Sequence, residues 1–154
     1  MRAMFRFAIA AFLFSVALPL VAQEHYTEGP VWVISFYRTK TDQFDNYMKY
    51  LRANYLVTTA ESKKQGVILD SKIYVKTLRD ANDWNVAIAS QYPSFAKALD
   101  FNAADDDKAK AISAAHFKTT DRDRQTQMTA PRLEMRDFVG TEMIREVTLK
   151  PIMK

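Results

Sequence analysis

The sequence predicts an α+β fold in which strands and helices follow one another in the order βαββαβ, with extra helix before the last strand. Two observations lead to this prediction. Segments 31–37, 67–78, 84–90 and 140–150 have strand character, and apolar residues recur at helical spacing in the stretches between them. The chain of 154 residues contains no Gly/Ser linker and no internal repeat, so a single domain is expected over residues 23–154.

The first strand and helix have the clearest pattern. Val31 to Tyr37 is β-branched and aromatic on both alternating faces, which is typical of a central strand covered on both sides. Thr39 to Asp42 offers helix-capping side chains. Apolar residues then recur at helical spacing until two lysines and Gly66, a basic last turn followed by a glycine stop. The recurring positions are Phe44, Tyr47, Met48, Leu51, Tyr55 and Thr58.

The next two strands differ from each other. The segment from Val67 to Leu78 alternates between apolar and polar residues, which predicts a half-exposed or edge strand. A turn-like stretch at 79–83 separates it from Trp84 to Ser90. One face of that third strand carries only small or modest polar side chains.

The second half of the chain is mainly helical until its final strand. Pro93 suits the first turn of a helix that runs to about Leu99. Two further helical pieces are expected at 105–117 and 121–138, the latter bent near Pro131. Residues 140–150 form the last strand, in which Arg145 shares a register with apolar positions that a strand would bury.

This element order predicts a ferredoxin-like sandwich, a four-stranded antiparallel sheet with helices on one face. A single sheet covered on one side would leave segment 31–37 half exposed, and monomeric proteins rarely expose an apolar patch of that kind. A homodimer is therefore expected.

Four segments, "FDNYMKYLRANY", "GVILDSKIYV", "NDW" and "GTEMIREV", together with the element order, resemble the dimeric α/β-barrel superfamily. That superfamily includes NIPSNAP-like, antibiotic-biosynthesis-monooxygenase-like and chlorite-dismutase-like families. The resemblance implies sheet order 4-1-3-2, with two sheets closing on each other around a possible pocket. It also implies that Arg145 or Glu146 lies near Lys72 or Asp70 of the other subunit, as a salt bridge at the interface or rim. The alternative for Arg145 is a fork for a ligand carboxylate.

The N-terminal segment has the layout of a secretory signal peptide over residues 1–22. Arg2 and Arg6 precede an apolar run from Phe7 to Leu18, and cleavage is expected after Ala22. The sequence has no cysteine, which excludes a lipid-anchored lipoprotein and disulfides. The mature protein is expected in a bacterial periplasm or secreted, without a membrane span.

Charge argues against nucleic acid as a partner. Removal of the signal peptide lowers the basic residues from 22 to 20 against 18 acidic ones, and the formal net charge from +4 to +2. The remaining charges are mixed in sign, with no basic stripe that would follow a phosphate backbone.

A small-molecule site is predicted where the first and third strands adjoin. Ala87 and Ala89 leave room on one face of the third strand, and Ser35 and Tyr37 would place hydroxyls beside that room. Six tyrosines are numerous enough to line a pocket, although core-edge positions with hydroxyls reaching water explain them as well. These are Tyr37, Tyr47, Tyr50, Tyr55, Tyr74 and Tyr92.

Histidine supply limits metal and nucleophile chemistry, because the chain contains only His25 and His116. His116 is expected to pack on a helix, with a haem ligand or a general base as the alternatives. After cleavage the chain would begin Gln23-Glu24-His25, either a flexible remnant of processing or a square-planar Cu(II) or Ni(II) site. The aspartates at 105–107 suit a helix N-terminus better than a calcium loop.

Three functions remain open from the sequence. The leading prediction is an exported, dimeric α/β-barrel protein that binds a small, largely apolar molecule. The first alternative is a cofactor-independent or haem-dependent oxidoreductase of the monooxygenase-like kind, with Tyr37, His116 and Arg145 as the residues to suspect. The second is an interaction module for another envelope protein. Whether the protein is an enzyme is left open.

Overall fold

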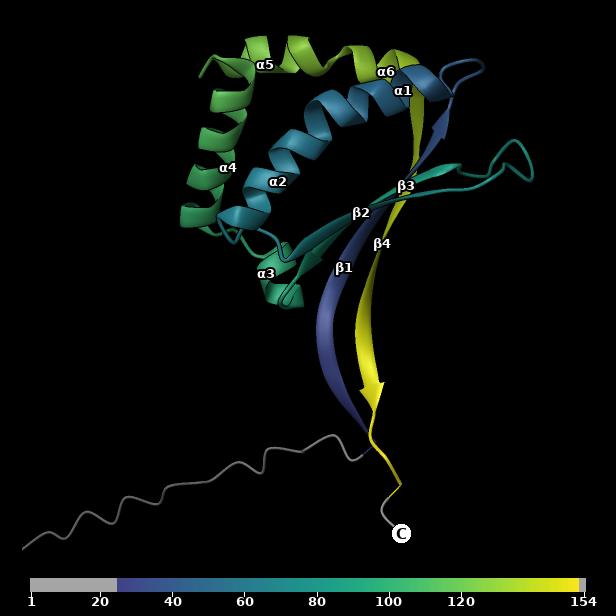
Figure 1. The fold of residues 1–154 in the computed structure, drawn as a ribbon, viewed down its shortest axis with the longest axis vertical. Helices are drawn as coiled ribbons and strands as arrows, with labels where there is room; N and C mark the ends of the chain where they lie inside the picture. Colours follow the sequence, from purple (N-terminus) through teal and green to yellow (C-terminus); the bar gives the residue numbers. More distant parts are fainter. Residues whose placement is uncertain (1–24, 153–154) are drawn as a thin grey trace, which may run out of the picture.

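The structure is a computed structural model that describes residues 25–152. A four-stranded antiparallel sheet carries helices on one of its faces (Figure 1). The predicted signal peptide, and Gln23 and Glu24 of the possible terminal metal site, lie outside the described residues. The elements are β1 (Tyr26–Thr39), α1 (Phe44–Tyr50), the π-helical segment η1 (Leu51–Tyr55), α2 (Leu56–Lys64), β2 (Asp70–Val75), β3 (Val86–Tyr92), α3 (Phe95–Leu99), α4 (Ala103–Phe117), α5 (Arg122–Thr129), α6 (Pro131–Met135) and β4 (Arg136–Leu149).

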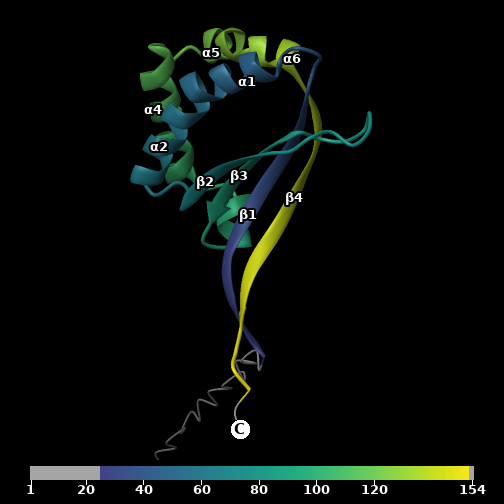
Figure 2. The ribbon, with the colours of Figure 1, turned by 45° about the vertical axis from the view of Figure 1, so that its right-hand side comes forward.

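The strands lie in the order β2-β3-β1-β4, which places β1 and β3 in the centre and makes β2 and β4 the edges. β1 and β4 each have 14 residues, twice the length of β3. They continue beyond the rest of the sheet as a two-stranded arm (Figures 1 and 2). The α+β, ferredoxin-like class predicted from the sequence is confirmed by this sheet and its helices.

The two faces of the sheet have different neighbours. In β1, Val33, Ser35 and Tyr37 point toward the helices, whereas Trp32, Ile34 and Phe36 lie on the opposite face. The helices of the described chain gather on one side of the sheet in both views (Figures 1 and 2). Helices thus cover one face of the sheet, as predicted, and Ile34 and Phe36 on the other face are only half-buried.

The predicted helix after the first strand is present, with a π-helical turn in its middle. α1, η1 and α2 follow one another without a break over residues 44–64. Gly66 has φ +71°, so the predicted glycine stop is confirmed by a left-handed residue that directly follows the C-cap residue Gln65. The expected side-chain cap is absent, because Gln43 occupies the N-cap position and makes no capping hydrogen bond through its side chain.

The predicted helix over residues 121–138 is wrong at its C-terminal end. Pro131 begins a separate short helix, α6, which stops at Met135. From Arg136 the backbone is extended and pairs with Thr39 of β1, so residues 136–138 belong to β4. Pairing with a central strand satisfies backbone groups of this stretch, and tertiary contact outweighs the local helical pattern.

The hydrophobic core lies between the helices and the sheet. Its centre consists of Tyr47, Leu51 and Val86, all nearly inaccessible to solvent. The partly buried residues packed around this centre are Met48, Tyr50, Tyr55, Ile88 and Met135. The covered face of the sheet and the helix layer are therefore joined mainly through the first helical region.

Candidate functional site

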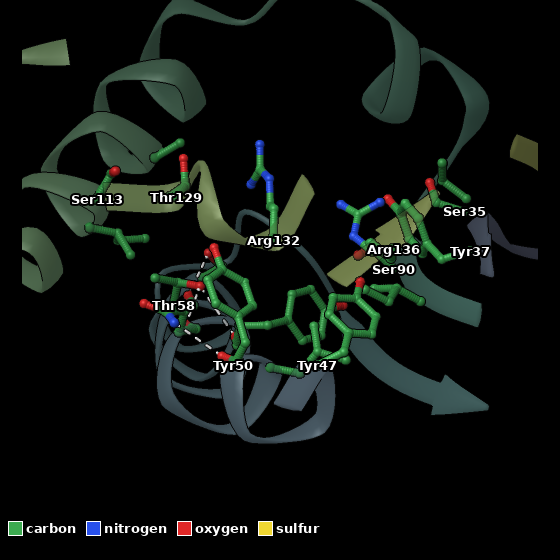
Figure 3. A pocket seen from close by; sticks show the side chains of 18 of the residues that line it. Ser35, Tyr37, Tyr47, Tyr50, Thr58, Ser90, Ser113, Thr129, Arg132 and Arg136 are labelled. Carbon is green, nitrogen blue, oxygen red and sulfur yellow. Dashed lines mark hydrogen bonds between the residues drawn. The ribbon is translucent and has the colours of Figure 1, made fainter. Parts of the chain in front are cut away.

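A cavity of about 560 Å³ lies between the helices and the covered face of the sheet (Figure 3). This volume falls in the range that binds small organic molecules. The lining residues come from β1, β3 and the first residue of β4 on the sheet side and from every helical element except α3. They are Val33, Ser35, Tyr37, Tyr47, Tyr50, Leu51, Asn54, Tyr55, Thr58, Ser62, Ile88, Ser90, Tyr92, Ala109, Ile112, Ser113, Phe117, Thr129, Arg132 and Arg136.

The polar side chains of this wall are mainly hydroxyl-bearing residues and arginines. Five tyrosines and six serine or threonine side chains line it, so hydroxyl groups dominate its polar character. Its only charged side chains are Arg132 and Arg136, and no aspartate or glutamate of the described chain is part of the wall. The cavity therefore combines aromatic surface, hydroxyls and uncompensated positive charge.

The break between α6 and β4 brings the two arginines to the cavity. Arg132 lies in the first turn of the short helix that Pro131 begins, and Arg136 is the first residue of the strand. Figure 3 shows both guanidinium groups among the side chains of the wall. Both Nε atoms are buried, and neither has a hydrogen-bond partner among the described residues.

Arg136 is held against aromatic rings. Its guanidinium carbon lies 3.5 Å from the ring centroid of Tyr37 and 5.4 Å from that of Tyr47. Such cation–π contacts orient the guanidinium group but leave its N–H donors unused. The donors of Arg136 are thus available to a bound acceptor.

Tyr47 places a phenol beside both arginines. The residue is 1% exposed, and its hydroxyl has no hydrogen-bond partner among the described residues. Burial raises the pKa of Tyr47 well above its ordinary value, and the charge of Arg136, followed by that of Arg132, opposes the rise only in part. Burial is also the main cause of the raised pKa values of Tyr55 and Tyr92. These phenols stay protonated at neutral pH and can donate hydrogen bonds.

The π-helical turn shapes the helix side of the cavity. Its residues Leu51, Asn54 and Tyr55 all contribute to the wall, and π-turns inside α-helices are frequent at functional sites. Asn54 also accepts, through Oδ1, a 3.0 Å hydrogen bond from Nε2 of His116, which lies outside the wall. Since that nitrogen is already engaged, the arrangement does not fit a haem in this cavity with His116 as its ligand.

The predicted grouping of Ser35 and Tyr37 with Ala87 and Ala89 is wrong. In the β1–β3 register Ser35 lies opposite Ile88 and Tyr37 opposite Val86, so both face the helices. Ala87 and Ala89 pair with Phe36 and Ile34 on the other face of the sheet. Only Ser35 and Tyr37 line the cavity.

Arg145 and Glu146 point to opposite faces of β4. Arg145 forms an ion pair with Glu28 of its own chain, and its guanidinium lies 4.6 Å from the ring of Phe95. Glu146 accepts hydrogen bonds from Trp32 Nε1 and, at 3.1 Å, from Gln91 Nε2 on the uncovered face. The half-buried position of Arg145 is thus explained within one subunit, and the contact across an interface stays a prediction.

The three residues suspected of oxidoreductase chemistry do not share one site. Tyr37 lines the cavity, whereas His116 and Arg145 do not. Within residues 25–152 no group of three or more His, Asp or Glu side chains is placed to hold a metal ion. In the same part of the chain no helix has the length and apolar character needed to cross a membrane.

Sequence reasoning missed Arg132 and Arg136 as site residues. Both fell inside a segment predicted as one helix, where arginines are ordinary surface residues. Pro131 was the available signal, because a proline at the start of a new helix changes the direction of the chain just before the two arginines. Five of the six tyrosines considered for a pocket do line the cavity, and Tyr74 is the exception.

Comparison with known proteins adds little. No protein-family model matches the chain, and no curated protein is significantly similar to it. One similar solved structure is a dimeric protein of unknown function with a ferredoxin-like fold from Bacteroides fragilis, with 11% identity over 79% of this chain and 97% of the other, at a TM-score of 0.38. A dimeric ferredoxin-like protein from an uncultured marine organism shows 11% identity over 81% and 98%, also at 0.38. At these values neither similarity bears on the function of this chain.

Proposed function

We propose that this protein binds a small organic molecule in the cavity between its helices and its sheet. The observation that carries the proposal is the pair of buried, unpartnered Nε atoms of Arg132 and Arg136 in a wall of tyrosines and hydroxyls. Buried polar groups normally have partners, so groups left without one in a cavity suit a bound ligand. The wall is otherwise aromatic and aliphatic, which favours a ligand with an apolar body.

The experiment that tests this proposal fills the cavity from its sheet side. Ser90 lies in the wall on β3, and Ser90→Leu adds apolar volume there. Native mass spectrometry of the purified protein, and calorimetric titration with small aromatic compounds, compare the variant with wild type. Weaker binding in the variant with an unchanged fold by circular dichroism supports the proposal. Equal binding by both proteins contradicts a site in this cavity.

A matched control changes a residue of the same strand on the other face. Ala89 is fully buried on the uncovered face, where it pairs with Ile34. Ala89→Ser makes a small change there and is expected to leave binding unaltered. A loss of binding in this control would point to a general disturbance of the sheet.

We further propose that the protein is a homodimer formed through the uncovered face of the sheet. Ile144 and Tyr74 on this face are 48% and 46% exposed, and Ile34 and Phe36 are half-buried. The arm formed by β1 and β4 adds exposed strand, and a two-stranded ribbon is only marginally stable alone. Light scattering of wild type and Ile144→Lys tests this. We expect a dimer that the lysine weakens, and a wild-type monomer would refute the proposal.

We propose that this dimer acts outside the cytoplasm after loss of residues 1–22. The support is the arrangement of two arginines, an apolar run and Ala22 in the N-terminal sequence. Intact-mass measurement of protein from the periplasmic fraction should give a chain that begins at Gln23. A full-length chain confined to the cytoplasm would contradict export.

A further inference from the structure

We propose that the ligand of this cavity is an aromatic carboxylate, whose carboxylate group is bound by Arg132 and Arg136 and whose ring packs against the tyrosines of the wall. This inference rests on the proposed binding function and specifies the class of ligand. Its starting point is the charge of the wall, in which two arginines stand without any acidic side chain from the described chain.

The arginines are uncompensated by ion pairs as well. Several other basic side chains pair with an acidic one, as Lys76 does with Asp83 and Arg38 with Asp137. Neither the Arg132 nor the Arg136 side chain forms an ion pair or a hydrogen bond with any residue of the described chain. Both arginines are partly buried, and a charge that is partly removed from water favours a counter-charge, so an anion is the ligand that such a cavity suits.

The geometry around Arg136 favours a planar anion. Contact with the Tyr37 ring at 3.5 Å orients the guanidinium plane, and its N–H donors form a fork that matches the two oxygens of a carboxylate. Tyr47, whose ring centroid lies 5.4 Å from the same guanidinium carbon, has an unpartnered hydroxyl that supplies one more donor. Arg132 provides a second fork from the neighbouring helix.

The remaining wall suits an aromatic body. The rings of Tyr37 on β1 and of Tyr47 and Tyr50 on α1 follow one another in the wall, with centroids of neighbouring rings 6.3 and 6.4 Å apart. Such rings favour stacked or edge contacts with another aromatic group. A cavity of about 560 Å³ holds a bicyclic ring with its acid group and leaves space for water.

A carboxylate fits these donors better than an inorganic anion. Inorganic phosphate and sulfate carry acceptors on all sides and no apolar surface, whereas much of this wall is aromatic or aliphatic. Inorganic anions would leave the tyrosine rings without contact. We therefore expect selectivity for the organic acid.

The test uses 2-naphthoate and 2-naphthamide, two probes of nearly the same shape that differ in charge. Calorimetric titration of the full-length mature protein should show 2-naphthoate binding about tenfold or more tightly, because hydrogen bonds to a charged group contribute more than neutral ones. Arg132→Gln and Arg136→Gln should each remove most of this preference, because each lowers the affinity for 2-naphthoate far more than the affinity for 2-naphthamide. Arg136→Lys keeps the charge without the fork, and it should recover only part of the preference.

Arg124→Gln on α5 is the matched control, because its side chain is 74% exposed and Arg124 is not part of the wall. It should bind both probes as wild type does. Thermal unfolding of each variant establishes that the protein tested is folded. If a glutamine variant does not fold, Arg136→Lys still tests the proposal.

Each outcome separates the ligand class from the binding function. Equal affinity for 2-naphthoate and 2-naphthamide would overturn the proposal that the ligand is a carboxylate. The proposal of small-molecule binding would stand, provided that Ser90→Leu weakens the binding of both probes. Failure of both probes to bind would overturn both proposals. Displacement of 2-naphthoate by equal concentrations of inorganic phosphate or sulfate would show a general anion site and overturn the choice of an aromatic carboxylate.

Discussion

Replacement of Tyr47 by phenylalanine separates what the hydroxyl does for stability from what it does for binding. The residue is 1% exposed, its hydroxyl has no partner among the described residues, and its ring belongs to the core. Leaving a buried hydroxyl unsatisfied costs about 1–3 kcal/mol. Removing the oxygen relieves that cost and leaves the ring contacts in place.

The expected effect of Tyr47→Phe is a rise of about 1 kcal/mol in the free energy of unfolding, at the lower end of that range. For a domain of this size the rise corresponds to about 3–6 °C in Tm. Binding should change in the opposite direction. Loss of one donor to the carboxylate weakens 2-naphthoate binding by about fivefold, equivalent to about 1 kcal/mol.

Thermal and urea unfolding measure the first effect, and calorimetric titration measures the second. Tyr50→Phe is the control, because Tyr50 lines the same cavity, stacks on Tyr47 with ring planes 12° apart, and is only half-buried. It should gain little stability. A fall of 1 kcal/mol or more in the stability of Tyr47→Phe would refute the reasoning, because it would show that the hydroxyl has a partner such as ordered water.

Two further predictions concern the rest of the chain. Lys76 and then Arg79 hold the pKa of Asp83 well below its ordinary value, with Lys76 Nζ 2.5 and 2.7 Å from the two carboxylate oxygens. A lowered folded pKa contributes stability above the unfolded value of about 3.9, and this is lost as pH falls below it. Unfolding measured between pH 7 and pH 2 should therefore show a smaller loss below pH 4 for Asp83→Asn than for wild type, and equal losses would contradict this role. Gly66→Ala should lower the free energy of unfolding by about 1–2 kcal/mol, because φ +71° is strained for alanine. An unchanged urea midpoint would refute this prediction.

Periodicity was enough to predict the elements and much of their order. The β-branched and aromatic pattern of 31–37 marks β1 because the requirement is local: alternate side chains must suit a pleated strand. The stop at Gly66 is local in the same sense, since only a residue that tolerates positive φ suits that position. The ends of β1 and β4 could not be predicted from local patterns. Their extra residues adopt strand conformation because the two strands pair with each other.

The candidate site depended on registers that no local pattern contains. A shift of one residue between β1 and β3 would move Ser35 and Tyr37 to the face of Ala87 and Ala89, and only the hydrogen-bonded pairing places the two sets on opposite faces. The local pattern predicts Arg132 and Arg136 as surface residues of a helix. Residue 136 is instead part of the sheet, because it pairs with β1. The sequence by itself determined where most strands and helices lie, because those preferences arise between near neighbours. The tertiary structure alone decided which side chains meet in the cavity, because that depends on contacts between residues far apart in the chain.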